Sequence, residues 1–339
     1  MNKKRVLAML LAGAMALSMT ACGGGNSAST DDSSNDGGAS ASGGSYKVSV
    51  ILKTLAAEYW QYVKSGAEDY ASEHSDKVTV EVKGPSSETA FDEMQNMIET
   101  DLSSGSYDGV IISPLQSDTA AQLVSGTKLP IVAIDTNFTA PEVKSFVGTG
   151  NEAAAKKGGE AAVEAAKAAG WTDIKCIEIA GVQGDQTNTA RMNGYKAGVE
   201  EAGGTFLSDE VQYADATADR ATTAMEAIMQ THPEGIAIIC ANNDDMAMAA
   251  ARAAQGHDAY KSTIFLGFNG DRAACEAILA GQMTMSVAQM AYEMGYKAVE
   301  TMVQVLDGET VDEFVDSGSD VVTPDNAQER LDTLKTQLH

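Results

Sequence analysis

From position 46 onward, short apolar runs rich in valine and isoleucine alternate with longer stretches in which apolar residues recur at helical spacing. Strands that are apolar along their whole length are buried on both faces, which is typical of parallel sheets covered by helices. The alternation therefore predicts an α/β fold with parallel sheets. The predicted strands are residues 48–52, 78–82, 110–112, 131–134, 174–179, 236–239 and 264–268.

Cap and stop residues mark helices between these runs. Asn151 is predicted to cap a helix that stops at Gly170, because asparagine favours the N-cap and glycine the residue after the last turn. Further helices are predicted over residues 243–254, 271–280 and 291–306. A chain of 339 residues is long for one domain of about 150 residues, so we expect two Rossmann-like lobes, each a parallel sheet flanked by helices.

The first 45 residues differ in composition from the rest. Three basic residues precede an apolar run at 6–17 that is too short to cross a bilayer, which needs about 20 residues. This pattern predicts a signal peptide over residues 1–21. The small residues before Cys22 resemble a bacterial lipobox, which implies a lipidated Cys22 at the mature N-terminus; the alternative is an ordinary signal peptide that leaves a stray cysteine. Residues 22–45, mostly glycine, serine and alanine, are predicted to form a flexible linker from a membrane anchor.

Charge and cysteine content exclude several functions. With 48 acidic and 23 basic residues, the formal net charge is −25, which disfavours contact with nucleic-acid phosphates. The other three cysteines, Cys176, Cys240 and Cys275, are widely spaced and form no zinc motif. We expect small buried thiols without a structural disulfide, and neither a metal nor a cofactor. No catalytic residues are assigned, since hydrolase, metalloprotease and nucleotide-binding motifs are missing from the sequence.

Most predicted strands end at polar residues. Lys53 follows the first strand, Asp135 and Thr136 follow the fourth, and Asn269 follows the last. In open parallel sheets, ligands bind outside the carboxyl ends of the strands. Turns and helix caps also need such residues, and capping is the alternative explanation for Asn243 in particular.

These residues belong to an ordered series of motifs that resembles the type I, ribose-binding-like periplasmic sugar-binding proteins. Residues 53–60 resemble the first strand–helix turn of that family, in which two adjacent aromatics cover the sugar. Later matches follow in the family's order over residues 46–320. The resemblance implies a ligand-binding set of Lys53, Tyr59, Trp60, Asp135, Thr136, Arg191, Asn243, Asn269 and Gln289.

The chemistry of these side chains suits the implied role. Tyr59 and Trp60 offer flat apolar surface to the C–H face of a sugar, with helix packing as the alternative. The carboxylate of Asp135 and the guanidinium of Arg191 form charge-assisted hydrogen bonds with hydroxyls. The three amide side chains each supply a donor and an acceptor.

Departures from the family pattern leave the ligand open. Thr136 stands where ribose binders have arginine, Asn269 where an aspartate is common, and Ala218 where a second-lobe aromatic is expected. Lys53 adds a cation, and residues 57–58 replace an Asn-Pro pair. From these positions we expect a pocket less acidic than a typical pentose site, open to a polyol, an unusual sugar or a sugar acid.

The resemblance and the lipobox together imply an extracytoplasmic, lipid-anchored substrate-binding protein that delivers a small sugar or polyol to an ABC permease. We expect a monomeric, non-enzymatic receptor without nucleic-acid partners. The alternative is a sensory subunit that presents its ligand to a membrane receptor kinase. Three hinge crossings are predicted near Thr149, Gln289 and Gly318. They divide the chain into an N-terminal lobe, residues 46–149 and 290–318, and a C-terminal lobe, residues 150–289 and 319–339.

Overall fold

The structure is a computed structural model that describes residues 45–338. The predicted signal peptide at 1–21, the lipidation site Cys22 and the linker up to residue 44 lie outside the described residues. Within the described range, no helix has both the length and the apolar character needed to cross a bilayer.

One sheet has six strands in the order β12-β5-β4-β3-β1-β2. Every neighbouring pair in it is parallel. Five of its strands come from the region before residue 150, and β12 comes from near the C-terminus. The strands are β1 (Tyr46–Ile51), β2 (Val78–Lys83), β3 (Gly109–Ile112), β4 (Ile131–Ile134), β5 (Val143–Gly148) and β12 (Phe314–Asp316).

A second sheet has the order β13-β11-β10-β9-β6-β7, and β8 also pairs with β6. Its pairs are parallel except for β13, which runs antiparallel to β11. The prediction of two parallel sheets is confirmed, with one antiparallel edge strand added. The strands are β6 (Lys175–Ala180), β7 (Thr205–Phe206), β8 (Gln212–Tyr213), β9 (Ile238–Ala241), β10 (Ile264–Asn269), β11 (Met285–Gln289) and β13 (Ser319–Val322).

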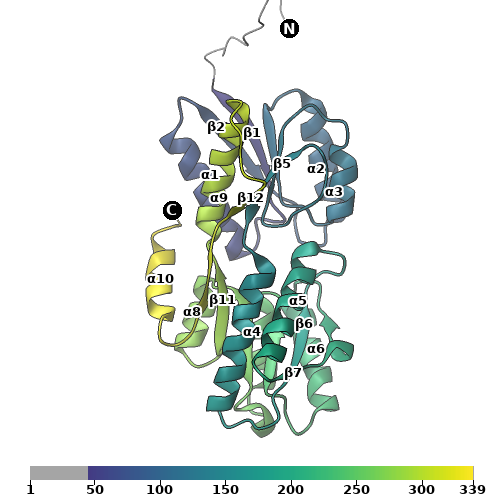
Figure 1. Cartoon of the computed structure of the whole chain (residues 1–339), viewed down its shortest axis with the longest axis vertical. Helices are drawn as coiled ribbons and strands as arrows, with labels where there is room; N and C mark the ends of the chain where they lie inside the picture. Colours follow the sequence, from purple (N-terminus) through teal and green to yellow (C-terminus); the bar gives the residue numbers. More distant parts are fainter. Residues whose placement is uncertain (1–44, 339) are drawn as a thin grey trace, which may run out of the picture. The chain divides into compact units, whose positions relative to one another are not determined.

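Helices cover both sheets (Figure 1). The four helices predicted around residues 151–169, 243–254, 271–280 and 291–306 are all present as α4, α7, α8 and α9. Two short 3₁₀ helices lie at Ser208–Glu210 and Asp258–Tyr260. The α-helices are α1 (Glu58–Glu73), α2 (Phe91–Ser104), α3 (Ser117–Val124), α4 (Asn151–Ala168), α5 (Gln186–Glu201), α6 (Ala218–Thr231), α7 (Asp244–Ala254), α8 (Arg272–Leu279), α9 (Ala291–Leu306) and α10 (Ala327–Lys335).

Helix α9 returns the chain to the first sheet, where it lies beside α1 (Figure 1). Two glycines allow the backbones to approach closely. A Cβ atom at Gly66 would lie 1.9 Å from the carbonyl oxygen of Tyr292, and one at Gly295 would lie 1.9 Å from that of Val63. No side chain fits at such distances. This contact fixes the segment that follows β11 against the N-terminal part of the chain.

The chain passes between the two sheets three times. The passages follow β5, β11 and β12, at residues 149–150, 290 and 317–318. The last one uses Gly318 with a φ of 96°, a left-handed conformation that glycine adopts without strain. The side chains of Thr149 and Ser317 are 3.3 Å apart, so two of the three connections touch.

The cysteines with described positions are free and buried, as predicted for Cys176, Cys240 and Cys275. Cys176 on β6 and Cys240 on β9 lie on neighbouring strands, with 3.3 Å between their Sγ atoms. They contribute to the core of the second sheet.

Candidate functional site

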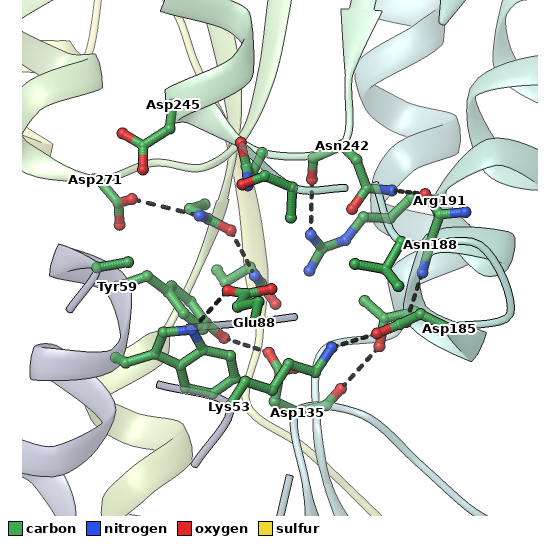
Figure 2. Close-up of a pocket in the computed structure, with 18 residues that line it drawn as sticks. Lys53, Tyr59, Glu88, Asp135, Asp185, Asn188, Arg191, Asn242, Asp245 and Asp271 are labelled. Atoms are coloured by element: carbon green, nitrogen blue, oxygen red, sulfur yellow. Dashed lines mark hydrogen bonds and ion pairs between the residues drawn. The ribbon is translucent and has the colours of Figure 1, made fainter. Parts of the chain in front are cut away.

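A pocket lies at the carboxyl ends of the strands and takes its lining from both sheets (Figure 2). It encloses about 620 Å³ of space not occupied by protein atoms, which includes the solvent at its open mouth. The lining consists of Lys53, Ala57, Tyr59, Trp60, Glu88, Asp135, Val182, Asp185, Thr187, Asn188, Arg191, Ala216, Asn242, Asn243, Asp245, Asn269, Asp271 and Gln289.

Eight of the nine residues predicted from the sequence line this one pocket: Lys53, Tyr59, Trp60, Asp135, Arg191, Asn243, Asn269 and Gln289. The ninth, Thr136, lies behind the lining. Its hydroxyl donates to Asp135 Oδ2 at 2.9 Å and lies 2.7 Å from the hydroxyl of Thr187. Thr136 therefore orients the Asp135 carboxylate and, through Thr187 on α5, connects the end of β4 to the part of the chain that forms the second sheet.

The aromatic pair forms one wall of the pocket. Tyr59 and Trp60 meet edge to face, with 4.9 Å between ring centroids, and both are almost fully buried at the start of α1. The Tyr59 hydroxyl donates to Asp135 Oδ1 at 2.7 Å, and Trp60 Nε1 donates to Glu88 Oε1 at 3.0 Å. Each ring is thus held by a carboxylate at its polar edge, which fixes the apolar surface that faces the pocket.

Lys53 spans the two sheets. Its Nζ forms a buried ion pair with Asp185, which belongs to the second sheet's half of the chain and also caps α5. Burial alone would lower the pKa of Lys53, but the carboxylates of Asp185, Asp135 and Glu88 raise that pKa above its ordinary value. Lys53 is therefore charged, and its ion pair with Asp185 links the part of the chain that forms the first sheet to the part that forms the second.

Arg191 on α5 lies on the opposite side of the pocket from Asp245 and Asp271 (Figure 2). Its Nε donates to Asn151 Oδ1 at 2.8 Å, and Nη1 donates to the Asn242 carbonyl at 2.8 Å. The guanidinium carbon lies 3.8 Å from the centroid of the Phe268 ring. Stacking and neutral acceptors orient the guanidinium. Within residues 45–338 Arg191 forms no ion pair, so its charge stays available to a ligand.

The nearby acid Glu178 does not compensate the positive charge of Arg191. Glu178 on β6 is fully buried, and burial raises its pKa to about 8 although Arg191 opposes the shift. At neutral pH Glu178 is therefore mostly a neutral acid. The expected role of Asn151 is corrected here: α4 begins at Asn151, which makes no cap, because its side-chain oxygen is committed to Arg191.

A chain of side chains runs along the second sheet's edge of the pocket. Gln289 Nε2 donates to Asn269 Oδ1 at 3.0 Å, and Asn269 Nδ2 reaches Asp271 Oδ2 at 3.4 Å. Burial raises the pKa of Asp271 well above its ordinary value, and the nearby Asp244 adds to the shift. Asn243 does cap α7, with its Oδ1 accepting from the Met246 amide at 2.9 Å, while it also lines the pocket.

Backbone strain is concentrated around the pocket. Among the described residues, four without a glycine's freedom have a positive φ: Asp135 (62°), Asp215 (46°), Ala216 (58°) and Asn269 (134°). Three of them line the pocket, and the fourth adjoins it in sequence. Such conformations cost roughly 1–3 kcal/mol each and gather at ligand sites, where they aim particular side chains. Their placement around this pocket supports its assignment as a ligand-binding site.

Several lining residues were missed by the sequence prediction. Glu88 lies in the loop after β2, Asp185 caps α5 and Asn188 lies on α5, so all three come five or more residues after a strand has ended. Asp245 and Asp271 lie at the starts of two predicted helices, α7 and α8, where acidic residues are common whether or not a ligand binds. With Asp135 and Asp185, the pocket has five carboxylates and two cations. The expectation of a pocket less acidic than a typical pentose site was based on positions that match the family pattern, and these additional carboxylates lie outside those positions.

The pocket chemistry suits binding by hydrogen bonds. Within residues 45–338, the lining contains no serine, cysteine or histidine, and no group of three or more metal-ligating side chains is arranged to hold a metal ion. The lining instead combines aromatic surface, carboxylates, amides and a guanidinium. These groups match a small molecule that has an apolar face and many hydroxyls.

Comparison with known proteins agrees with this geometry. Residues 48–310 match the family model described as a periplasmic binding protein domain. The chain is 30% identical over 265 residues to the D-allose-binding periplasmic protein of Escherichia coli, which covers 75% of this chain and 83% of that protein. It is 28% identical over 268 residues to the ribose import binding protein RbsB of E. coli, and the match covers 78% of this chain and 86% of that protein.

A solved structure is similar in fold. An ABC transporter solute binding protein from Agrobacterium vitis with bound D-fucose superposes with a TM-score of 0.75 at 24% identity, covering 86% of this chain and 100% of that one. The family match spans most of the chain, and the two sheets with three connections have the corresponding architecture. The chain belongs to the periplasmic binding protein family and has its type I fold.

Proposed function

We propose that the protein binds a small sugar or polyol in the pocket between its two sheets and delivers it to the permease of an ABC importer. The observation that carries this proposal is the Tyr59–Trp60 wall, whose rings are fixed by Asp135 and Glu88 and which lines the same cavity as Arg191. Figure 2 shows Tyr59 across this cavity from Arg191. A sugar ring presents C–H groups to the aromatics and oxygens to the guanidinium. The E. coli relatives bind D-allose and ribose by name, which supports the same ligand class here.

We also propose that the two sheets belong to lobes that close on the ligand. The N-terminal lobe would comprise residues 46–149 and 290–318, and the C-terminal lobe residues 150–289 and 319–339. The sheet order supports this division, because β12 joins the first sheet and β13 the second. Lining from both lobes means that a ligand stabilises the closed arrangement through contacts on each side.

The delivery step also needs a location. We propose that the mature protein begins at a lipidated Cys22, acts as a monomer outside the cytoplasm, and is held near its permease by the 22–45 linker. The sequence before residue 45 supports this proposal. The name of the E. coli ribose relative, an import binding protein, supports a transport role.

A thermal-shift screen of the purified protein against pentoses, hexoses, deoxysugars, polyols and sugar acids tests the binding proposal. A ligand at 100 times its dissociation constant adds about 2.7 kcal/mol to stability. That gain corresponds to a rise of several degrees in melting temperature. We expect one strong hit. Trp60→Ala is expected to weaken its binding at least 30-fold, because the variant removes the apolar wall and leaves Glu88 without its donor.

The matched control is Trp171→Phe. Trp171 does not line the pocket, and its Nε1 donates to the Ser262 carbonyl at 2.7 Å. This variant should bind the hit with unchanged affinity. Equal loss of binding in both tryptophan variants, or a panel without any hit, would count against a sugar site at Trp60.

A further inference from the structure

The hydrogen-bonding groups of the pocket are unevenly used. Most donors are already engaged inside the protein: Tyr59 with Asp135, Trp60 with Glu88 and Lys53 with Asp185. Acceptors are left over. Gln289 is 1% exposed, lines the pocket, and its Oε1 has no hydrogen-bond partner among the described residues. An unpaired buried acceptor is costly, so this site requires donors from its ligand.

Two carboxylates on the same side of the pocket, Asp245 and Asp271, form no close ion pair among the described residues, although Arg252 acts on Asp245 and Arg330 on Asp271 at longer range. Figure 2 shows Asp245 and Asp271 together on the side away from Arg191. Within residues 45–338 neither forms an ion pair, and the Asp271 carboxylate has one long contact, 3.4 Å from Asn269 Nδ2. Asp245 is exposed and Asp271 is half-buried, so a ligand that covers them withdraws both carboxylates from water, which is unfavourable unless the ligand brings positive charge.

Helix capping does not explain these two acids. Asn243 already caps α7, and Asp244 accepts both the Asp271 amide at 3.0 Å and the Ser286 hydroxyl at 2.6 Å. Asp271 occupies the N-cap position of α8, but its side chain makes no capping hydrogen bond. Asn243 thus caps α7, and the Asp271 carboxylate, which makes no capping bond to α8, is left for the pocket.

The two sides of the pocket thus differ in charge. Arg191, with Asn188 and Asn242 beside it, offers donors on one side, and Asp245 and Asp271 offer acceptors on the other (Figure 2). In total, five carboxylates and two cations line the cavity, and one of these cations is already neutralised by Asp185. A ligand that fits both sides has hydroxyl or ring oxygens at one end and a cationic donor at the other.

We propose that the preferred ligand is an amino sugar or amino polyol, whose ammonium group lies against Asp245 and Asp271 with its oxygens toward Arg191. This inference rests on the proposed function and narrows the ligand class. An ammonium supplies three donors, and its positive charge opposes the burial that raises the pKa of Asp271 and Asp245, so it stabilises both carboxylates in the ionised form. Sugar acids and sugar phosphates are disfavoured, because their charge would face an excess of carboxylates.

Titration calorimetry on the purified protein tests the proposal with matched sets of sugars. Each set contains a neutral hexose, its 2-amino-2-deoxy form, its N-acetyl form and its uronic acid, in the gluco, galacto and manno series. Sorbitol and 1-amino-1-deoxysorbitol form a polyol pair. In at least one set we expect the amino member to bind at least tenfold more tightly than the neutral one. The N-acetyl form, which has no charge, should lose that advantage, and the acid should not bind.

The double variant Asp245→Asn/Asp271→Asn tests the residues. Asparagine keeps the size of each side chain and removes its charge, so the ratio of amino to neutral affinity should fall to about one. The matched control is Asp209→Asn/Asp258→Asn, which removes the same charge from two exposed positions outside the pocket. The control should keep the preference, which separates local pairing from long-range attraction.

The outcomes distinguish the two proposals. Neutral hexoses or polyols that bind as tightly as their amino partners would overturn the amino-sugar inference and leave the receptor function in place. A preference that survives in the Asp245/Asp271 variant would overturn the assigned contact. If no member of any set binds, both the inference and the proposed sugar-binding function are contradicted.

Discussion

Replacing Lys53 by methionine is expected to weaken binding of the ligand found in the sugar screen by 100-fold or more. Lys53 and Asp185 form a buried ion pair between the two halves of the site. Removing one partner of such a pair costs about 3–5 kcal/mol, because the other charge stays buried alone. Here Asp185 would be left near two further carboxylates, Asp135 and Glu88. Since tenfold in affinity corresponds to about 1.4 kcal/mol, a loss of this size is readily measured by calorimetry.

A second substitution separates closure from direct ligand contact. In Lys53→Met/Asp185→Asn the stranded carboxylate is also removed, and asparagine retains the capping role of position 185 on α5. We expect the double variant to recover at least tenfold of the lost affinity. If Lys53 acted only by touching the ligand, no recovery would follow. Lys64→Met is the control: Lys64 pairs with Glu68 at the surface over 3.7 Å, and its loss should change affinity less than fivefold.

Glu178→Gln is expected to change how stability depends on pH. The folded-state pKa of Glu178 is about 8, above the ordinary 4.5, because burial disfavours the charged form. Between these values the folded protein binds a proton that the unfolded chain releases, so Glu178 makes the protein less stable as pH rises. The glutamine variant does not titrate. Its free energy of unfolding relative to the natural protein should therefore rise by about 3 kcal/mol between pH 4.5 and pH 7.

Urea unfolding at both pH values measures this change. A constant cost of placing an amide in the core cancels in the comparison of the two conditions. Glu226→Gln, on an exposed face of α6, is the control and should show the same difference from the natural protein at both pH values. If the free energy of unfolding of Glu178→Gln differed from that of the natural protein by the same amount at both pH values, Glu178 would be ionised in the folded protein. Its negative charge would then compensate the charge of Arg191.

The sequence pattern predicted the strands in which valine and isoleucine predominate, and it missed β5 and β11. β5 and β11 contain polar residues that face the interior: Ser145 donates to the Asp312 carbonyl, and Ser286 donates to Asp244. Periodicity cannot identify such strands, because their buried polar groups are satisfied only in the folded chain. The edge strands β12 and β13 are short and half-exposed, so they carry little hydrophobic signal.

For the site, strand ends were the informative positions. Lys53, Asp135 and Asn269 directly follow apolar runs, and all three line the pocket. Glu88 lies five residues after β2, in a loop whose path depends on the Trp60 hydrogen bond. The role of Thr136 also depends on tertiary structure, because its hydroxyl meets that of Thr187, a residue 51 positions later in the chain, only in the folded protein. Pairings between distant segments are set by tertiary structure, which no single-sequence pattern records.

Tryptophan fluorescence offers the most direct test of the central claim that the ligand binds between the two sheets. The chain has two tryptophans, and only Trp60 lines the pocket, so Trp171→Phe leaves a single reporter inside the proposed site. Titrating this variant with the ligand from the screen should give a saturable change in emission with the dissociation constant found by calorimetry. Calorimetric saturation with unchanged Trp60 emission would contradict the account, because the ligand would then bind elsewhere.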